Sequence, residues 1–133
     1  MADTAATDMI HGLVPLAVTL GITADAARPD EVVLCLDWAS SLTTGGGVLH
    51  GGIVMALADT SGAVCAFLNL PEGAGGTTTI ESKTNFFAAT RSGTVKAHSR
   101  PLHVGRRVIV VETEIRGDNG KLAAKTIQSQ AVL

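Results

Sequence analysis

The sequence predicts an α+β fold in which a six-stranded antiparallel sheet wraps around one long central helix. Residues 50–70 are almost wholly apolar, which is typical of a helix that is buried on most sides. Two strand-like segments precede this helix, and four segments with a two-residue alternation follow it. The 133 residues suit a single domain, residues 1–133, because domains commonly hold about 150 residues.

The N-terminal third should hold a short helix and a hairpin. Apolar side chains recur at helical spacing over residues 9–21, but a glycine and a proline interrupt the pattern, so we expect an irregular helix. The turn Arg28-Pro29-Asp30 separates two strand-like segments, residues 22–27 and 31–38, which should pair as a hairpin.

The long apolar segment should be the central helix. It follows a polar, glycine-rich loop over residues 39–47 and stops at Pro71, and its alanines and leucines favour a helix over a strand pair. Because nearly every face is apolar, protein should surround it. A membrane span is disfavoured, since Asp59 lies near the centre and two glycines stand at the start.

The C-terminal half should form the larger part of the sheet. Polar and apolar side chains alternate in four segments, residues 77–87, 93–101, 106–116 and 121–132. Asp118-Asn119-Gly120, between the last two segments, is a strong signal for a tight hairpin.

Composition narrows the class of protein. Apolar residues make up 46% and charged residues 17% of the chain, which indicates a folded globule. The mean hydropathy of +0.33 is high for a small soluble monomer, so part of the surface should lie against another subunit. The net charge of −2 and the scarcity of aromatic residues argue against a nucleic-acid partner.

The cysteines and the N-terminal segment favour a cytoplasmic protein. Cys35 and Cys65 lie in unrelated apolar segments without a disulfide or metal-binding spacing, which fits a reducing compartment. Two aspartates and no basic residue precede the first apolar stretch, whereas a secretory signal begins with positive charge. His98 and His103 should face opposite sides of a strand, so no metal site is expected.

Asp59 is the first candidate for chemistry. It is the only formally charged residue between Asp37 and Glu72, in the middle of the helix expected to be most buried. An unpaired carboxylate is costly to bury, so the site should open to a cleft or keep the carboxyl neutral. A functional role competes with a structural one, in which Asp59 bonds to Thr60, Ser61 or a neighbouring loop.

The start of the same helix is the second candidate. His50-Gly51-Gly52 stands there, and the first N–H groups of a helix have no partner inside it, so they can donate to a carbonyl oxygen or an oxyanion. The glycines let a ligand approach the backbone, and His50 would cap or orient the turn. Alternatively, the glycines only permit close packing on the sheet and His50 is structural.

Spacing constrains how the two candidates act together. Gly51 and Asp59 are eight residues apart, which is about 12 Å along a helix axis. One acyl carbon therefore cannot touch both groups of the same helix. If both act on one carbonyl, the helix start comes from one subunit and the carboxylate from its partner, which predicts a composite site at a dimer interface.

Basic residues gather in one part of the chain. Of ten Lys and Arg residues, only Arg28 precedes position 83, and residues 83–107 contain no acid. This segment can present a positive surface to an anionic ligand such as a phosphate-bearing substrate. Alternatively, its charges are the solvated faces of strands. The basic cluster consists of Lys83, Arg91, Lys96, Arg100, Arg106 and Arg107, together with His98 and His103.

Taken together, these features resemble the hotdog-fold acyl-coenzyme A thioesterases, in particular the phenylacetate-type or aryl-CoA subfamily. The resemblance runs from about Leu16 to Leu133. The matching stretches are Gly47-Val48-Leu49-His50-Gly51-Gly52, then Ala58-Asp59, then Thr79-Ile80-Glu81 opening a strand that ends at Phe86, and Pro101-Leu102-His103-Val104-Gly105-Arg106-Arg107.

The resemblance implies an assembly and a role for each matching residue. It implies dimers with a continuous sheet, and tetramers formed as dimers of dimers. Asp59 would be the nucleophile or general base, the Gly51 N–H would polarise the thioester carbonyl, and His50 would support that end of the site. Thr79 would line the region of the attacking water or acyl group, and the two neighbouring arginines would lie near the phosphates of coenzyme A. The expected substrate contacts are Thr44, Gly52, Phe86, Phe87, Ala88, Ala89, His103, Val104, Gly105, Arg106, Arg107 and Val108.

Thr44 departs from the family pattern. Six residues before the histidine, the family commonly carries Asn or Gln, whose amide helps to hold the carbonyl or the water. A threonine hydroxyl is shorter and cannot offer two donors, so either the water is held differently or activity is lower.

We therefore expect an enzyme that hydrolyses an aryl- or medium-chain acyl-CoA thioester, with no cofactor beyond the coenzyme A of its substrate. Two alternatives stay open. A hotdog hydratase would act on enoyl thioesters through a histidine and an acid. A non-catalytic module would bind acyl-CoA without turning it over.

Overall fold

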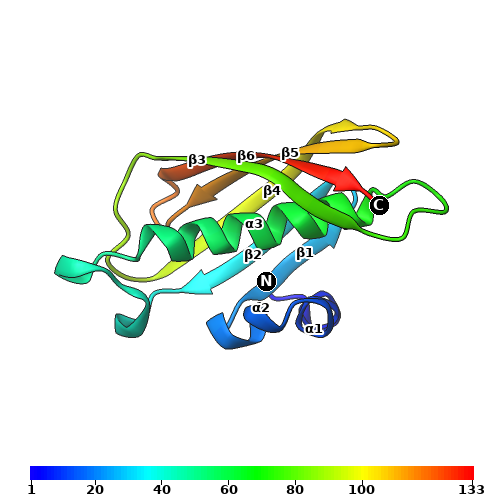
Figure 1. Ribbon diagram of the computed structural model, residues 1–133. Coiled ribbons are helices and arrows are strands. Elements are labelled where there is room, and N and C mark those ends of the chain that lie inside the picture. Colours follow the sequence, from blue (N-terminus) through cyan, green and yellow to red (C-terminus); the bar gives the residue numbers. More distant parts are fainter.

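Six antiparallel strands form one sheet, and a long helix lies across one of its faces (Figure 1). The computed structural model describes residues 1–133. The strand order is β1-β2-β4-β5-β6-β3, which confirms the predicted hotdog arrangement around a central helix. The elements are α1 (Thr4–Leu13), α2 (Pro15–Leu20), β1 (Thr23–Arg28), β2 (Glu31–Asp37), α3 (Gly51–Leu68), β3 (Thr77–Phe86), β4 (Thr94–Val104), β5 (Val108–Arg116) and β6 (Leu122–Val132).

Two short helices replace the single irregular helix that the sequence predicts over residues 9–21. The first helix, α1, begins earlier because Asp3 caps it, with Oδ1 accepting from the Ala6 N–H at 3.0 Å. Val14 is extended, as the residue before a proline prefers, and Pro15 begins α2. The first turn of α1 lacks the apolar periodicity, which is why the pattern hides this start.

The strands agree with the prediction except around the β4–β5 turn. β4 continues to Val104, past the predicted end at Pro101, and β5 begins at Val108. The register shifts between Pro101 and His103, and this irregularity carries the strand past a proline that cannot donate a ladder hydrogen bond.

One half of the sheet, formed by β1, β2 and β4, presents an apolar surface to α3. Val32, Leu34 and Leu36 of β2 and Val95 and Ala97 of β4 are at most 1% exposed. α3 is long and apolar enough to cross a membrane, but half of it is buried inside the protein. It is therefore the core helix of this domain.

The other half of the sheet, formed by β5, β6 and β3, adds polar groups to an apolar lining in which Ile109, Val111 and Ile115 of β5 are 0% exposed. Thr113 of β5 and Thr126, Gln128 and Gln130 of β6 are each at most 1% exposed. These residues follow the two-residue alternation of their strands, so their polar side chains occupy positions that normally hold aliphatic ones. β3 lies beyond β6 as an edge strand.

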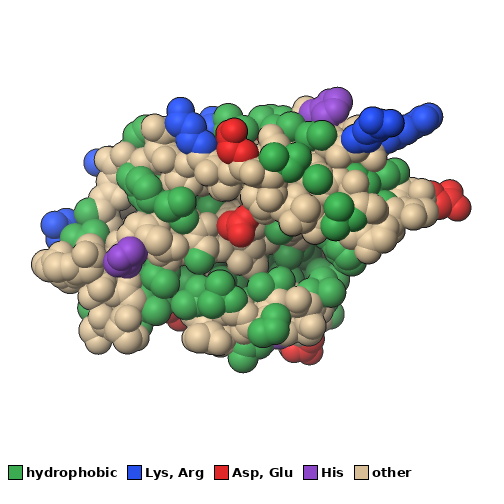
Figure 2. Space-filling model, in the orientation of Figure 1, with side chains coloured by type: hydrophobic (Ala, Val, Ile, Leu, Met, Phe, Trp, Pro, Cys, Tyr) green, Lys and Arg blue, Asp and Glu red, His purple; other side chains and the backbone are tan.

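One face of α3 is uncovered, contrary to the expectation that protein surrounds the helix. Gly52, Met55, Asp59 and Phe67 lie on this face, and Met55 and Phe67 are 41% and 42% exposed. The physical reason is that a single sheet can cover only one side of a helix. On this side, hydrophobic and uncharged atoms fill most of the surface, with basic side chains at the rim (Figure 2).

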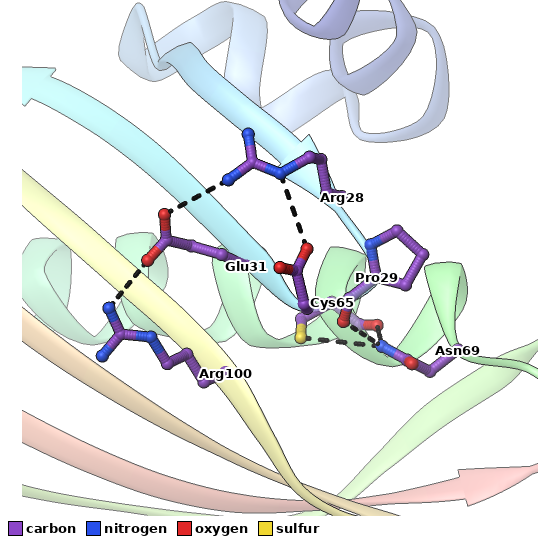
Figure 3. Close-up of polar contacts among 7 residues, drawn as sticks. Arg28, Pro29, Glu31, Cys65, Asn69 and Arg100 are labelled. Carbon is purple, nitrogen blue, oxygen red and sulfur yellow. Dashed lines mark hydrogen bonds and ion pairs between the residues drawn. The ribbon is translucent and has the colours of Figure 1, made fainter.

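The C-terminal end of α3 is tied to the β1–β2 turn (Figure 3). Asn69 Nδ2 donates to the Pro29 carbonyl at 2.7 Å and to the Cys65 carbonyl at 2.8 Å. Figure 3 also shows Glu31 of β2 between two arginines. The asparagine contacts therefore fasten the end of the helix to the turn between the first two strands.

Candidate active site

Asp59 lies on the uncovered face of α3 and is exposed, so of the two arrangements expected from the sequence the structure has the one in which the site opens to the surface. Its Oδ1 atom accepts two hydrogen bonds, from Thr79 Oγ1 of β3 at 3.0 Å and from Gln128 Nε2 of β6 at 3.0 Å. Both protein hydrogen bonds to the carboxylate fall on this one atom. The carboxylate is therefore held through Oδ1, and Oδ2 is free to react.

The expected structural partners of Asp59 within its own helix do not contact it. Thr60 Oγ1 donates to the Ala56 carbonyl at 2.8 Å. Ser61 Oγ lies 2.7 Å from Ser99 Oγ in the core. The partners of Asp59 come from the sheet instead.

Two buried glutamines of β6 complete the surroundings of the carboxylate. Gln130 Nε2 donates to Thr79 Oγ1 at 2.6 Å, and Gln130 Oε1 accepts from Thr77 Oγ1 at 3.1 Å. Gln128 donates directly to Asp59, while its own Oε1 has no partner. Neither glutamine is predicted from the sequence as part of the site. The signal that could have found them is their alternate spacing on the inward face of a predicted strand.

The start of α3 leaves one N–H group free. His50 Nδ1 accepts from the Gly52 N–H at 2.8 Å, which confirms the predicted cap. The Ile53 and Val54 N–H groups donate to the His50 carbonyl at 2.9 and 3.1 Å. The Gly51 N–H has no protein partner, so it is the donor of the first turn that can meet a substrate oxygen. Because Nδ1 is an acceptor, the neutral imidazole carries its proton on Nε2.

A largely apolar groove of about 340 Å³ opens beside Gly51. The Phe86 ring lies against this glycine, since a Cβ at position 51 would meet its Cζ at 3.4 Å. Of the expected substrate contacts, Thr44 and residues 86–89 line the groove. Its other walls are Val48, Leu49, Val54, Thr90, Ile115 and Ala123.

His50 and Gly52 border a different cavity. This cavity, of about 360 Å³, is also lined by Ser41, Thr43 and Ile53. Because the Gly52 N–H is occupied by His50, the structure does not bring Gly52 to the groove with Gly51.

Another cavity, of about 490 Å³, adjoins the groove. Phe87 lines both this cavity and the groove. Arg91 and Lys121 stand in its walls beside Asp118 of the β5–β6 turn. Lys121 is not among the residues that the sequence singles out. The fold brings it here because the β5–β6 turn adjoins the end of β3.

The two segments expected to bind substrate lie at opposite ends of the sheet. Phe86 pairs with Ala124 of β6, near the β5–β6 turn. Residues 103–108 form the β4–β5 turn, where the Arg107 carbonyl accepts from the Val132 N–H at the other end of β6. Figure 1 shows this turn at the upper right and the end of β3 at the left. One protomer therefore does not bring the two segments together.

Ion pairs divide the expected basic cluster. Lys96 bonds to Asp25 at 2.7 Å, and Arg100 bonds to Glu31 at 2.8 Å. The hydrogen bond from Lys96 lowers the pKa of the Asp25 carboxyl and raises the pKa of the Lys96 ammonium group. These two cations are already neutralised by β1 and β2. The Lys and Arg members that form no ion pair are Lys83, Arg91, Arg106 and Arg107.

Both cysteines are free and buried. Burial raises the pKa of the Cys35 thiol and of the Cys65 thiol to about 11. A thiol is nucleophilic only as the thiolate, so neither is an active nucleophile near neutral pH. No group of three His, Cys, Asp or Glu side chains is placed to hold a metal ion.

Known proteins resemble this chain in sequence and in fold. The sequence profile of the thioesterase superfamily matches residues 46–124. The 1,4-dihydroxy-2-naphthoyl-CoA hydrolase of Escherichia coli is 33% identical over 87 residues, which are 65% of this chain and 63% of that protein. A thioesterase from Haemophilus influenzae superposes with a TM-score of 0.88 at 28% identity, over 99% of this chain and 93% of that one. A mutant thioesterase from Pseudomonas aeruginosa gives a TM-score of 0.89 at 25% identity, over 98% and 96% of the two chains.

Proposed function

The chain belongs to the thioesterase superfamily, and from that premise we propose that it hydrolyses an acyl-coenzyme A thioester to a free acid and coenzyme A. One observation carries the proposal: an exposed carboxylate held through a single oxygen shares a helix with one unpartnered N–H group. Acyl transfer uses both groups, one to supply or activate the nucleophile and one to stabilise the oxyanion. The proposed reaction uses no cofactor beyond the coenzyme A of the substrate.

In this reaction Asp59 either attacks the thioester carbonyl or takes a proton from a water molecule that attacks it. Oδ2 is the reacting oxygen, because Oδ1 already accepts two hydrogen bonds. The Gly51 N–H donates to the carbonyl oxygen as negative charge develops, and one such donor is commonly worth about 3 kcal/mol. The carbon–sulfur bond then breaks, and coenzyme A leaves as a thiolate that takes up a proton. Where water attacks, this step yields the free acid directly. Where Asp59 attacks, it leaves an acyl–Asp59 anhydride, which a water molecule hydrolyses to the free acid and the regenerated carboxylate.

We place this chemistry between two subunits. Gly51 and Asp59 are about 12 Å apart along α3, too far for one carbonyl carbon. β3 is an edge strand on which Ile80 is 62% exposed, and the neighbouring face of α3 is uncovered. Antiparallel pairing of two β3 edges would continue the sheet and cover this face. It would also bring Gly51 of the partner subunit toward Asp59.

The same dimer accounts for the separation of the two substrate-binding segments. A two-fold axis beside β3 would place the β4–β5 turn of one subunit near the groove of the other. Arg106 and Arg107 on that turn form no ion pair, so they are available to the phosphates of coenzyme A. Tetramers would then form as dimers of dimers.

The groove supports an apolar acyl group. Aliphatic and aromatic side chains form most of its walls, which suits an aryl or a medium-chain acyl group. An aryl group would agree with the phenylacetate-type subfamily of these enzymes. The two free, buried cysteines support a reducing, cytoplasmic location.

Complementation between two inactive variants tests the composite site. Gly51→Pro removes the free N–H yet suits the first position of a helix, and His50 before it is already extended. Asp59→Asn removes the carboxylate. Each variant alone should be inactive, whereas unfolding them together and refolding should restore about a quarter of wild-type activity, because half of the dimers carry one intact site. A mixture as inactive as its parts would contradict a site shared between subunits.

A panel of aryl- and alkyl-CoA esters tests the reaction itself. Release of free coenzyme A that depends on Asp59 is the expected result. His50 borders a separate cavity, and its Nδ1 already accepts a hydrogen bond from the Gly52 N–H. Both facts argue against a histidine–acid pair that would hydrate an enoyl thioester. Thr44 lines the groove at the position where the family commonly carries an amide side chain. This substitution favours one alternative function, that of a module that binds acyl-CoA without hydrolysing it. Binding of coenzyme A with no hydrolysis of any ester would favour that module.

A further inference from the structure

Gln128 carries the one buried side-chain nitrogen or oxygen atom of the protein that has no hydrogen-bond partner. The side chain is 1% exposed, and Oε1 is unpartnered. Such atoms are rare in folded proteins, because each loses its hydration and gains nothing in return. An aliphatic side chain of similar size would fill the same space without this loss. Packing therefore does not explain why an amide stands here.

The other end of the amide supplies a reason. Gln128 Nε2 donates to Asp59 Oδ1 at 3.0 Å, and this donor can face a carboxylate only if Oε1 turns the opposite way, toward Gly62 of α3. Any side chain at position 62 would collide with Oε1. The glycine thus provides the space in which the orphan oxygen is tolerated.

We infer that Gln128 is the positioning residue of Asp59, an inference that rests on the proposed function. Asp59 stands on the uncovered face of α3, where a carboxylate could otherwise adopt several rotamers. Donors from Gln128 and Thr79 converge on Oδ1, and Gln130 in turn holds the Thr79 hydroxyl. This arrangement presents Oδ2 in one orientation to the thioester.

Gln128→Met tests the role directly, because it keeps the approximate volume and removes the donor. We expect kcat to fall about 100-fold, the effect of a misplaced reacting group, with KM changed by less than about twofold. Thr126→Val is the matched control: it removes a buried hydroxyl from the same strand, bonded only to Thr84 at 2.7 Å. It should leave kcat unchanged. A folded Gln128→Met protein with wild-type kcat would overturn the inference.

Gly62→Ala tests the same hydrogen bond between Gln128 and Asp59 without changing either residue. The new methyl group would displace the Gln128 amide, so kcat should again fall about 100-fold. In a Gln128→Ala background the space is vacant, and Gly62→Ala should then have no further effect on kcat. Equal losses in the two backgrounds would show that Gly62 acts independently of Gln128 and would contradict the inference.

Thermal unfolding provides a readout that needs no substrate. In the wild-type background Gln128→Met removes both the hydrogen bond to Asp59 and the unpartnered Oε1, so its two effects on Tm oppose each other. In an Asp59→Ala background that hydrogen bond is already absent, so Gln128→Met should raise Tm by more than it does in the wild type. The same shift in both backgrounds would overturn the inference. The predicted difference in a protein that hydrolyses no thioester would support the hydrogen bond to Asp59 and overturn the proposed function alone.

Discussion

The two halves of the sheet meet the same helix with different chemistry. β1, β2 and β4 bury mainly aliphatic side chains against α3, with Ser99 of β4 as a polar exception that lies 2.7 Å from Ser61. β5, β6 and β3 combine aliphatic side chains of β5 with buried hydroxyl and amide groups. No side chain of the first half bonds to the carboxylate of Asp59. The second half directs hydrogen bonds to one carboxylate. The comparison suggests that stability and chemistry are assigned to separate strands, and mutation can test whether they separate.

The largest effect should come from the carboxylate that the polar half holds. Asp59→Asn keeps the shape of the side chain but removes the base or nucleophile, so kcat should fall about 10³-fold, or about 4 kcal/mol in the barrier. Thiol release from acyl-CoA measures this with a disulfide reagent, since Cys35 and Cys65 are buried and contribute little background. An active Asn variant would remove Asp59 from the mechanism.

A truncation in the apolar half should affect stability instead. Leu34 of β2 is 0% exposed, and Leu34→Ala should lower the free energy of unfolding by about 2–5 kcal/mol through the cavity it leaves. Ile127→Ala, on the outer face of β6 where the side chain is 46% exposed, is the control and should cost far less. Urea denaturation measures both. A changed kcat in the folded Leu34→Ala protein would show that the two halves are not independent.

Thr79→Val should have a smaller effect on the rate. It removes one of the two donors to Asp59 Oδ1 and leaves Gln130 Nε2 without its acceptor, so we expect kcat to fall about tenfold, or about 1.4 kcal/mol. Thr78→Val, the neighbouring position with its side chain on the other face of β3, should leave kcat unchanged. Similar losses from the two variants would point to β3 as a whole rather than to the hydroxyl of Thr79.

The smallest effect should come from the outer face of the apolar half. The pKa of Asp25 is lowered, so its pairing with Lys96 stabilises the protein above the unfolded value of about 3.9 and is lost as pH falls through the lowered one. The pKa of Lys96 is raised, so the contribution of its charge to the free energy of unfolding is fully present below the unfolded value of about 10.4. This contribution is lost as pH rises through the raised pKa.

Lys96→Met should therefore lower the free energy of unfolding by less than about 1 kcal/mol at neutral pH, since the ammonium group is partly exposed. The difference should vanish in strong acid. Denaturation curves at the two pH values test this. A loss that persists in acid would assign the effect to packing of the lysine stem.

Much of the fold could be predicted because its signals are local. The change from an apolar run to two-residue alternation identifies α3 and the strands after it, and Asp118-Asn119-Gly120 identifies the last hairpin. The start of α1 could not be found in this way, because a cap at Asp3 leaves no periodic signal.

The candidate site was only half predictable. An isolated charge and a glycine pair single out Asp59 and Gly51 in the sequence alone. Gln130 meets Thr79 through the pairing of β3 with β6, and Gln128 meets Asp59 through the packing of α3 on β6. No local pattern specifies either contact. Apolar content likewise reveals that α3 must be covered, but it does not reveal whether the same chain or another copy provides the cover.

β3 lies at the edge of the sheet and also contributes Thr79 and Phe86 to the site. In the proposed dimer, one strand therefore forms the interface between the subunits and also lines the active site. Dilution that dissociates the dimer would then abolish activity without unfolding the subunits. Substitutions along this strand would be constrained both by subunit pairing and by the chemistry of the site.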